Sequence, residues 1–313
     1  MKQNIKSKNS NTVIVGMGVQ GKKRKVNLGK KFIASVDINK KKTKSNYKFL
    51  SEIPKDKYSN VFICVPDAQK KKIINECIKN KKNILVEKPL ILPNKELNYL
   101  YKKAIKKKVL LYTAYNHRFE PGIEKIKKIL NKKTIGKLYY CKIFYGNGTS
   151  FLVRKSNWKD KGEGVVPDLG SHLIDMCIFL FGTKITSIKL LSINNFENKS
   201  SDHAKIQVNY KGIKIFLEMS LCSWKNSFYF DLYGSLGSIH LNSLCKWSKS
   251  TLSIRKRKFP SGIPMEKKII YPKGDKTWKK EITYFEKLDL TKNNIQIDKE
   301  KIINNNLSKL RRN

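Results

Sequence analysis

The sequence predicts an α/β protein in which a nucleotide-binding domain of parallel strands and helices precedes a second domain of antiparallel strands. Three observations support this fold class. An apolar run at residues 12–15 leads into the glycine-rich turn Gly16-Met17-Gly18-Val19-Gln20-Gly21. Apolar strand patterns then alternate with helical patterns as far as residue 116, as in a parallel α/β sheet. From residue 136 the pattern changes to polar–apolar alternation with short connections, which favours antiparallel neighbours.

Length and composition favour two folded domains. The chain has 313 residues, more than a typical single domain, and 40% of them are hydrophobic, which is enough to form cores. We expect residues 1–116 to form a Rossmann NAD(P)-binding domain. Residues 117–313 are expected to form a second α/β domain whose final helix, near 298–311, returns toward the first domain; the family resemblance given below implies that this domain binds the substrate and forms the oligomer.

Cysteine spacing and hydropathy indicate a cytoplasmic protein. The six cysteines lack the spacing of metal ligands, so we expect no metal site. The first eleven residues lack the apolar stretch of a secretory signal. No apolar run approaches the length that a membrane span needs, so no membrane partner is expected.

The net charge of +43 raises the question of nucleic-acid binding, because lysine and arginine neutralise phosphates. Only 7 of the 67 basic residues are arginine, however, and bidentate recognition of bases and phosphates favours arginine. The lysines are spread along the whole chain. We therefore interpret the charge as a lysine-rich solvated surface and expect no nucleic-acid partner; steep salt-dependent DNA binding would contradict this interpretation.

The glycine-rich turn and the aspartate after it predict a dinucleotide site. In a strand–turn–helix unit the first glycine permits a tight turn, the second lets a pyrophosphate approach, and the third allows helix–strand contact. The phosphates then lie at the N-terminus of the next helix. The second strand ends in Asp37, where an acid accepts hydrogen bonds from the adenosine ribose; this favours NAD over NADP, although Asn39 and Lys40 are close by. The turn residues assigned to the cofactor are Gly16, Gly18, Val19, Gln20 and Gly21.

Three later strands end at residues that we assign to the same ligand-binding edge. Ligands of parallel α/β sheets bind beyond the carboxyl ends of the strands. The strand 61–65 leads into Pro66, the strand 84–86 runs into Glu87-Lys88-Pro89, and the strand 109–112 precedes Asn116. Lys88 therefore emerges where a nicotinamide should lie. The strand-end residues assigned to the cofactor are Val65, Pro66, Glu87, Lys88 and Asn116.

A second candidate site lies in the run Asp168-Leu169-Gly170-Ser171-His172-Leu173-Ile174-Asp175. On a helix, positions i, i+4 and i+7 share a face, so Asp168, His172 and Asp175 should point the same way. A carboxylate one turn from an imidazole is an arrangement that handles protons. Combined with a nucleotide-binding turn, it indicates hydride chemistry on an alcohol.

Taken together, the glycine-rich turn, Glu87-Lys88-Pro89, Asn116-His117-Arg118-Phe119 and the run from Asp168 to Asp175 resemble the glucose–fructose oxidoreductase / inositol 2-dehydrogenase (Gfo/Idh/MocA) family over nearly the whole chain. The resemblance implies a Rossmann domain, a second domain with a large, mostly antiparallel sheet, and NAD(P)-dependent oxidation or reduction of a sugar, cyclitol or nucleotide-sugar hydroxyl. It also implies a homodimer or homotetramer formed through the open face of that sheet.

The resemblance also implies roles for individual residues. Lys88 would hydrogen-bond the reacting hydroxyl, Asp168 and His172 would form the acid/base pair, and Asp175 would touch substrate. The peptide bond after Lys88 is expected to be cis. One departure from the family is Ala68-Gln69-Lys70, where the family often has a histidine.

Further substrate contacts are expected from a polar and aromatic segment, 146–164. It holds Arg154 and Trp158, which suit an anion and a sugar ring, although an ordinary surface loop explains the segment equally well. His117 either joins the site or only packs at the domain junction, and residues 243–275 indicate little. The residues assigned to substrate binding are Lys88, Asn116, Arg118, Arg154, Trp158, Asp168, His172 and Asp175.

The leading hypothesis is an NAD(P)-dependent dehydrogenase that acts on the CH–OH groups of a small polyhydroxylated substrate. Its catalytic residues would be Lys88, Asp168 and His172. The alternative is a catalytically silent protein that senses NAD(H) or binds a partner. The presence of all three catalytic candidates argues against that alternative.

Overall fold

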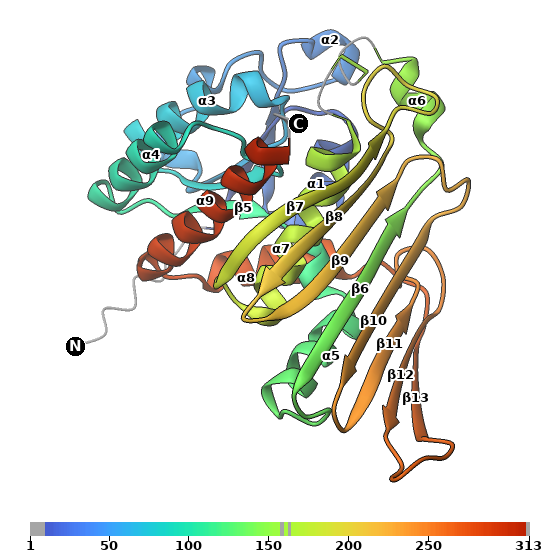
Figure 1. The fold of residues 1–313 in the computed structure, drawn as a ribbon. Helices are drawn as coiled ribbons and strands as arrows, with labels where there is room; N and C mark the ends of the chain where they lie inside the picture. The colour runs from blue at the N-terminus through green and yellow to red at the C-terminus, as the bar shows by residue number, and fades with distance from the viewer. Residues whose placement is uncertain (1–9, 157–159, 162–163, 311–313) are drawn as a thin grey trace, which may run out of the picture. The chain divides into compact units, whose positions relative to one another are not determined.

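The computed structural model describes residues 10–156, 160–161 and 164–310. The chain divides into two compact units, each built around its own sheet (Figure 1). The first unit comprises the residues up to Tyr115 together with Trp278–Asn304. The second comprises Asn116–Thr277 together with the residues from Asn305 on. The C-terminal part of the chain therefore contributes to the unit that the N-terminal residues begin.

The first unit contains a sheet of five parallel strands in the order β2-β1-β3-β4-β5. The strand order reverses between β1 and β3, and doubly wound sheets bind their ligands at such a reversal. The strands are β1 (Thr12–Val15), β2 (Phe32–Val36), β3 (Asn60–Ile63), β4 (Asn83–Glu87) and β5 (Leu111–Ala114). The helices that lie wholly or mostly in this unit are α1 (Val19–Leu28), α2 (Lys40–Thr43), α3 (Asp67–Lys79), α4 (Asn94–Lys106), α8 (Thr277–Lys287) and α9 (Asn293–Leu310).

These strands are largely buried on both faces, which explains why their sequences are mostly apolar. On one face, a core cluster joins Val13 of β1 to Ile74 of α3 and Leu100 of α4. On the other face, Phe62 of β3 packs edge-to-face against Phe285 of α8, with ring centroids 5.6 Å apart. Helix α8 is therefore an integral part of the first unit's core.

The second unit contains an eight-stranded sheet in the order β13-β12-β11-β10-β6-β9-β8-β7. All neighbouring pairs are antiparallel except β6 and β9. The strands are β6 (Leu138–Gly146), β7 (Ile185–Asn194), β8 (His203–Tyr210), β9 (Ile213–Ser220), β10 (Ser227–Gly234), β11 (Gly237–Asn242), β12 (Ser250–Lys256) and β13 (Met265–Tyr271). A hairpin turn between Gly234 and Gly237 joins β10 to β11.

Among the described residues, three helices that lie wholly in the second unit and a π-helical turn accompany this sheet. They are α5 (Pro121–Asn131), α6 (Ser150–Arg154), the π-helical turn Val166–Gly170 and α7 (Ser171–Phe181). Helix α7 is buried along nearly its whole length. Short 3₁₀ turns occur at Gly29–Lys31, Leu50–Glu52, Lys55–Lys57, Asn116–Phe119 and Leu290–Lys292.

The predicted fold class, a Rossmann-like parallel sheet followed by a mostly antiparallel sheet, is confirmed. Residues 243–275, about which the sequence indicated little, contain β12 and β13. Two details of the prediction were wrong. The final helix begins at Asn293 rather than near 298. The run that begins at Asp168 starts with the π-helical turn, so its first residues do not follow α-helical spacing.

Among the residues that the structure describes, no helix is both long enough and apolar enough to cross a lipid bilayer.

Candidate active site

The glycine-rich turn shows which glycines the fold itself requires. Gly16 has φ +93°, and a Cβ there would lie 2.5 Å from the carbonyl oxygen of Cys64. A Cβ at Gly21 would lie 2.0 Å from the carbonyl oxygen of Gly16. A Cβ at Gly18, by contrast, would meet no protein atom within 4 Å. Gly18 is exposed at the N-terminus of α1, as are Val19 and Gln20. The open space at Gly18 fits a pyrophosphate, which helix N-termini favour.

Asp37, at the end of β2, is held beside this turn. Its Oδ2 accepts a hydrogen bond from the backbone N–H of Met17 at 2.8 Å. Its Oδ1 accepts one from the backbone N–H of Asn39 at 2.9 Å. Asp37 is half-buried, so the orientation of its carboxylate is set by the protein while part of it faces solvent. This geometry fits an acid that accepts hydrogen bonds from a ribose.

Lys88 directly follows the last residue of β4, and its bond to Pro89 is cis, as expected. Lys88 is half-buried. At the end of β3, Val65 is half-buried and Pro66 is exposed. Three strand-end residues assigned to the cofactor, Val65, Pro66 and Lys88, therefore keep part of their surface accessible within the first unit.

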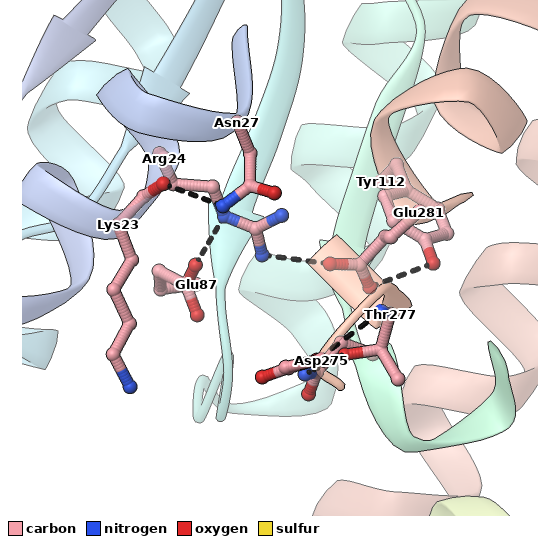
Figure 2. Close-up of polar contacts among 9 residues, drawn as sticks. Lys23, Arg24, Asn27, Glu87, Tyr112, Asp275, Thr277 and Glu281 are labelled. Atoms are coloured by element: carbon pink, nitrogen blue, oxygen red, sulfur yellow. Dashed lines mark hydrogen bonds and ion pairs between the residues drawn. The ribbon is translucent and has the colours of Figure 1, made fainter. Parts of the chain in front are cut away.

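A buried ion-pair network supports Glu87, the residue before Lys88 (Figure 2). The guanidinium of Arg24, on α1, donates from Nε to Glu87 Oε1 and from Nη2 to Glu281 Oε2, both at 2.7 Å. Tyr112 Oη donates to Glu281 Oε1 at 3.2 Å. Burial raises the pKa of Glu281, although Arg24 opposes that shift. Burial also disfavours the charge of Arg24, but the two carboxylates outweigh it and raise the pKa of Arg24.

A second lysine, which the sequence analysis did not single out, holds the same turn. Lys70 of α3 is 2% exposed and donates to the carbonyl oxygens of Glu87 and Pro89 at 2.6 Å and 2.7 Å. It also pairs with Asp67 at 2.5 Å. Nothing in a chain with so many lysines marks Lys70 except its place in the segment that departs from the family.

In the second unit, the three residues of the predicted proton-handling run differ in exposure. Asp168 lies in the π-helical turn and is exposed, whereas His172 and Asp175 lie in α7 and are 8% and 1% exposed. Both oxygens of Asp175 accept hydrogen bonds from Arg118, one of them from Nε at 2.6 Å. The Arg118–Asp175 ion pair thus joins two residues that the sequence assigned to substrate binding.

His172 stands in an aromatic and basic cluster. Its imidazole stacks on that of His117, with centroids 3.9 Å apart and planes 17° from parallel. Lys246 Nζ lies 2.8 Å from His117 Nε2 and 3.2 Å from Tyr145 Oη. Burial raises the pKa of Tyr145, and the charges of Asp168 and Glu120 raise it further, so its phenol keeps its proton. Lys246 was missed because residues 243–275 carried no motif.

The remaining substrate assignments have varied surroundings. Asn116 is 8% exposed and donates from Nδ2 to Thr277 Oγ1 at 2.8 Å. Arg154 is exposed on α6, with its guanidinium carbon 5.4 Å from the ring centroid of Phe151. Trp158 lies outside the described residues. Across residues 10–156, 160–161 and 164–310, no group of three His, Cys, Asp or Glu side chains is placed to hold a metal ion.

A parallel sheet whose first strand turns through glycines into a helix, with an acid at the end of the second strand, defines a dinucleotide-binding protein of the Rossmann type. Residues 10–115 match the family model described as "Oxidoreductase family, NAD-binding Rossmann fold". Residues 123–240 match the model described as "GFO/IDH/MocA C-terminal domain". The chain belongs to the GFO/IDH/MocA family of oxidoreductases.

Relatives share either part of the sequence or the fold. The trans-1,2-dihydrobenzene-1,2-diol dehydrogenase of Xenopus laevis is 30% identical over 117 residues, which cover 37% of this chain and 35% of that protein. The chain thus spans about a third of the length of that curated relative. Two solved structures, each with 16% identity, share the fold. A putative NADPH-dependent oxidoreductase from Desulfitobacterium hafniense has a TM-score of 0.80 and covers 96% of this chain and 95% of its own. Levoglucosan dehydrogenase in complex with NADH has a TM-score of 0.78 and covers 96% and 97%.

Proposed function

We propose that this protein is an NAD(P)-dependent dehydrogenase that transfers a hydride between a nicotinamide cofactor and a hydroxyl or keto group of a sugar, cyclitol or nucleotide-sugar. The observation that carries the proposal is the open space at Gly18, at the N-terminus of α1, next to a carboxylate held by the same turn. Membership of an oxidoreductase family with an NAD-binding domain supports it.

The chain's own residues have distinct roles in this proposal. A bound nicotinamide supplies a ring carbon that accepts or gives a hydride. Lys88 hydrogen-bonds the reacting hydroxyl and stabilises the negative charge that develops on its oxygen. His172 takes the hydroxyl proton as general base and returns it in the reverse direction. Asp168 orients His172, and either Asp175 or Asn116 holds a neighbouring hydroxyl.

NAD is the proposed cofactor rather than NADP. The Asp37 carboxylate, held by the N–H groups of Met17 and Asn39, would repel a 2′-phosphate. We expect Asp37→Ser to weaken NAD binding and to shift the ratio of NADP to NAD turnover upward. Asp56→Ser, at an exposed aspartate of the same unit, should leave both unchanged. An unaltered ratio in Asp37→Ser would contradict this choice of cofactor.

A ligand panel tests the activity directly. Thermal shifts with NAD(H), NADP(H), inositols, hexoses, levoglucosan and UDP-sugars identify ligands, because a ligand that binds the folded state raises its stability. Turnover is then followed through NADH absorbance with each hit. Lys88→Met and His172→Gln should each lower turnover by about 10²-fold or more and leave NAD affinity nearly unchanged. Lys95→Met and His203→Gln are the matched controls.

The panel also separates this proposal from its alternative. Binding of NAD(H) with no turnover of any hit, or full turnover in both Lys88→Met and His172→Gln, would reject the dehydrogenase mechanism and favour a sensor. We further propose a homodimer or homotetramer formed through the eight-stranded sheet. All six cysteines are free thiols, which supports a reducing compartment such as the cytoplasm.

A further inference from the structure

We propose that Lys70 is a positioning residue for Lys88, an inference that rests on the function proposed above. Lys70 lies on α3, and its ammonium donates to the carbonyl oxygens of Glu87 and Pro89 at 2.6 Å and 2.7 Å. These are the residues immediately before and after Lys88. One buried ammonium therefore holds the backbone on both sides of the residue that is proposed to bind the reacting hydroxyl.

The burial of Lys70 indicates that its positive charge has a role that an apolar side chain of similar size would not perform. Its side chain is 2% exposed, and burial lowers its pKa. An ammonium has three donors, and here they meet two carbonyl oxygens and the Asp67 carboxylate, which opposes the shift in pKa. An apolar side chain fills a buried position without the desolvation cost of a charge. We infer that the ammonium is kept because of the two carbonyls that it holds.

We expect the loss of Lys70 to displace Lys88. With both flanking carbonyls held, the Lys88 backbone cannot move unless two short hydrogen bonds lengthen. A misplacement of about 1 Å of a catalytic group costs on the order of 10²-fold in rate. The loss of Lys70 should therefore appear in the rate of the chemical step and leave the affinity for NAD nearly unchanged.

The chain offers a matched control in Lys82. This lysine is 9% exposed, lies in the same unit, and donates from Nζ to the carbonyl oxygens of Lys55 and Tyr58. It therefore has the same chemistry as Lys70, a buried ammonium that holds two backbone carbonyls, but its carbonyls do not flank Lys88. A purely structural role predicts the same outcome for Lys70→Met and Lys82→Met.

The first experiment is a double-mutant cycle on the full-length protein, with a substrate found in the panel. We expect Lys70→Met to lower kcat by about 10²-fold with little change in the KM for NAD. The double variant Lys70→Met/Lys88→Met should turn over no more slowly than Lys88→Met alone, because residues that act through one another are not additive. Lys82→Met should lower Tm and leave kcat unchanged. Lys70→Arg, which keeps a charged donor, should recover part of the lost rate.

The second experiment needs no substrate. Crystal structures of the wild type, Lys70→Met and Lys82→Met are compared at the turn 87–89. We expect Lys70→Met to displace Lys88 Nζ by about 1 Å, the misplacement that the rate loss implies, and Lys82→Met to leave it in place. If Lys70→Met does not fold, Lys70→Gln, which keeps amide donors, takes its place in both experiments.

Several outcomes would overturn the inference. A Lys70→Met variant with wild-type kcat would do so, as would additive losses in the double variant or an unmoved Lys88 in the crystal structure. If Lys88→Met itself keeps full turnover, the proposed function fails instead. The crystallographic comparison still decides whether Lys70 sets the geometry of Lys88.

Discussion

Arg24→Met should destabilise the first unit far more than Lys31→Met, although both basic residues pair with a glutamate of α8. The Arg24 side chain is 1% exposed, and its partners Glu87 and Glu281 are 11% and 0% exposed (Figure 2). Removing one partner of a buried ion pair costs about 3–5 kcal/mol, because the remaining charge is left buried without compensation. Lys31, whose side chain is 43% exposed, pairs with Glu286 of α8. Solvent screens that pair, so Lys31→Met should cost about 0–1 kcal/mol.

Urea unfolding, followed by far-UV circular dichroism, measures both variants against the wild type. We expect the midpoint of Arg24→Met to fall well below that of Lys31→Met, with little change in slope. Adding Glu281→Gln to Arg24→Met should recover part of the loss, because it removes one of the uncompensated carboxyls. If the free energies of unfolding of Arg24→Met and Lys31→Met lie within about 1 kcal/mol of each other, Arg24 does not compensate the buried charges of Glu87 and Glu281.

Three further predictions follow from the geometry. Gly21→Ala should disrupt the glycine turn and lower Tm, because its Cβ would lie 2.0 Å from a backbone oxygen. Gly18→Ala should keep the wild-type Tm and weaken NAD binding. Calorimetry and NAD titration separate the two variants, and equal effects on Tm and on NAD affinity would contradict the assignment of Gly18 to the cofactor. Burial raises the pKa of Glu281 above its usual 4.5, so stability should fall as pH rises from 4.5 to that raised pKa and level off above it, where the ionised carboxylate pairs with Arg24. Glu281→Gln should flatten that decline in urea unfolding curves measured at several pH values. Lys246→Met should lower kcat by roughly tenfold or more, the free energy of a hydrogen bond that a charged group donates, here from Lys246 to His117. An equal loss of kcat in Lys249→Met, at an exposed lysine, would contradict a specific role for Lys246.

The first sheet was predictable because each of its strands is buried on both faces. Such strands are short, mostly apolar runs that end near a glycine, a proline or a polar residue. The second predicted strand, which leads into Asp37, is the observed β2, and the preceding helix α1 ends at Gly29. The glycine turn and Asp37 were predictable for a related reason, since backbone geometry and a ribose contact each demand particular residue types.

Other elements lack such a signal. Residues Met265–Tyr271 form β13, an edge strand most of whose residues are exposed, so its sequence shows no clear alternation. Helix α8 carries many charged residues, and its core contacts with Phe62 and Tyr112 and its Glu281–Arg24 ion pair are evident only in the folded chain. The start of the run at Asp168 was misplaced for a different reason: a π-helical turn uses residues that also suit an α-helix.

The lysines show most clearly which site residues the sequence alone does not reveal. Most of the 67 basic residues are lysine, and sequence alone does not distinguish a solvated lysine from one that holds a turn. What distinguishes Lys70 and Lys246 is what surrounds them in the folded chain: two flanking carbonyls for the first, an imidazole and a phenol for the second. Such partners come from residues more than fifteen positions away in the sequence. Periodicity and short motifs relate only residues that are close in the sequence, so they do not predict such contacts.

The turn that carries Lys88 is held from two helices at once. Arg24 of α1 binds the Glu87 side chain, and Lys70 of α3 binds the Glu87 and Pro89 carbonyls. Because α1 begins at the glycine turn, any shift of that helix on cofactor binding acts on Glu87 through one buried ion pair. The placement of Lys88 therefore depends on the same helix whose N-terminus is proposed to receive the pyrophosphate. The Arg24–Glu87 ion pair therefore connects the helix that begins at the proposed cofactor site with the residue before the proposed catalytic amine.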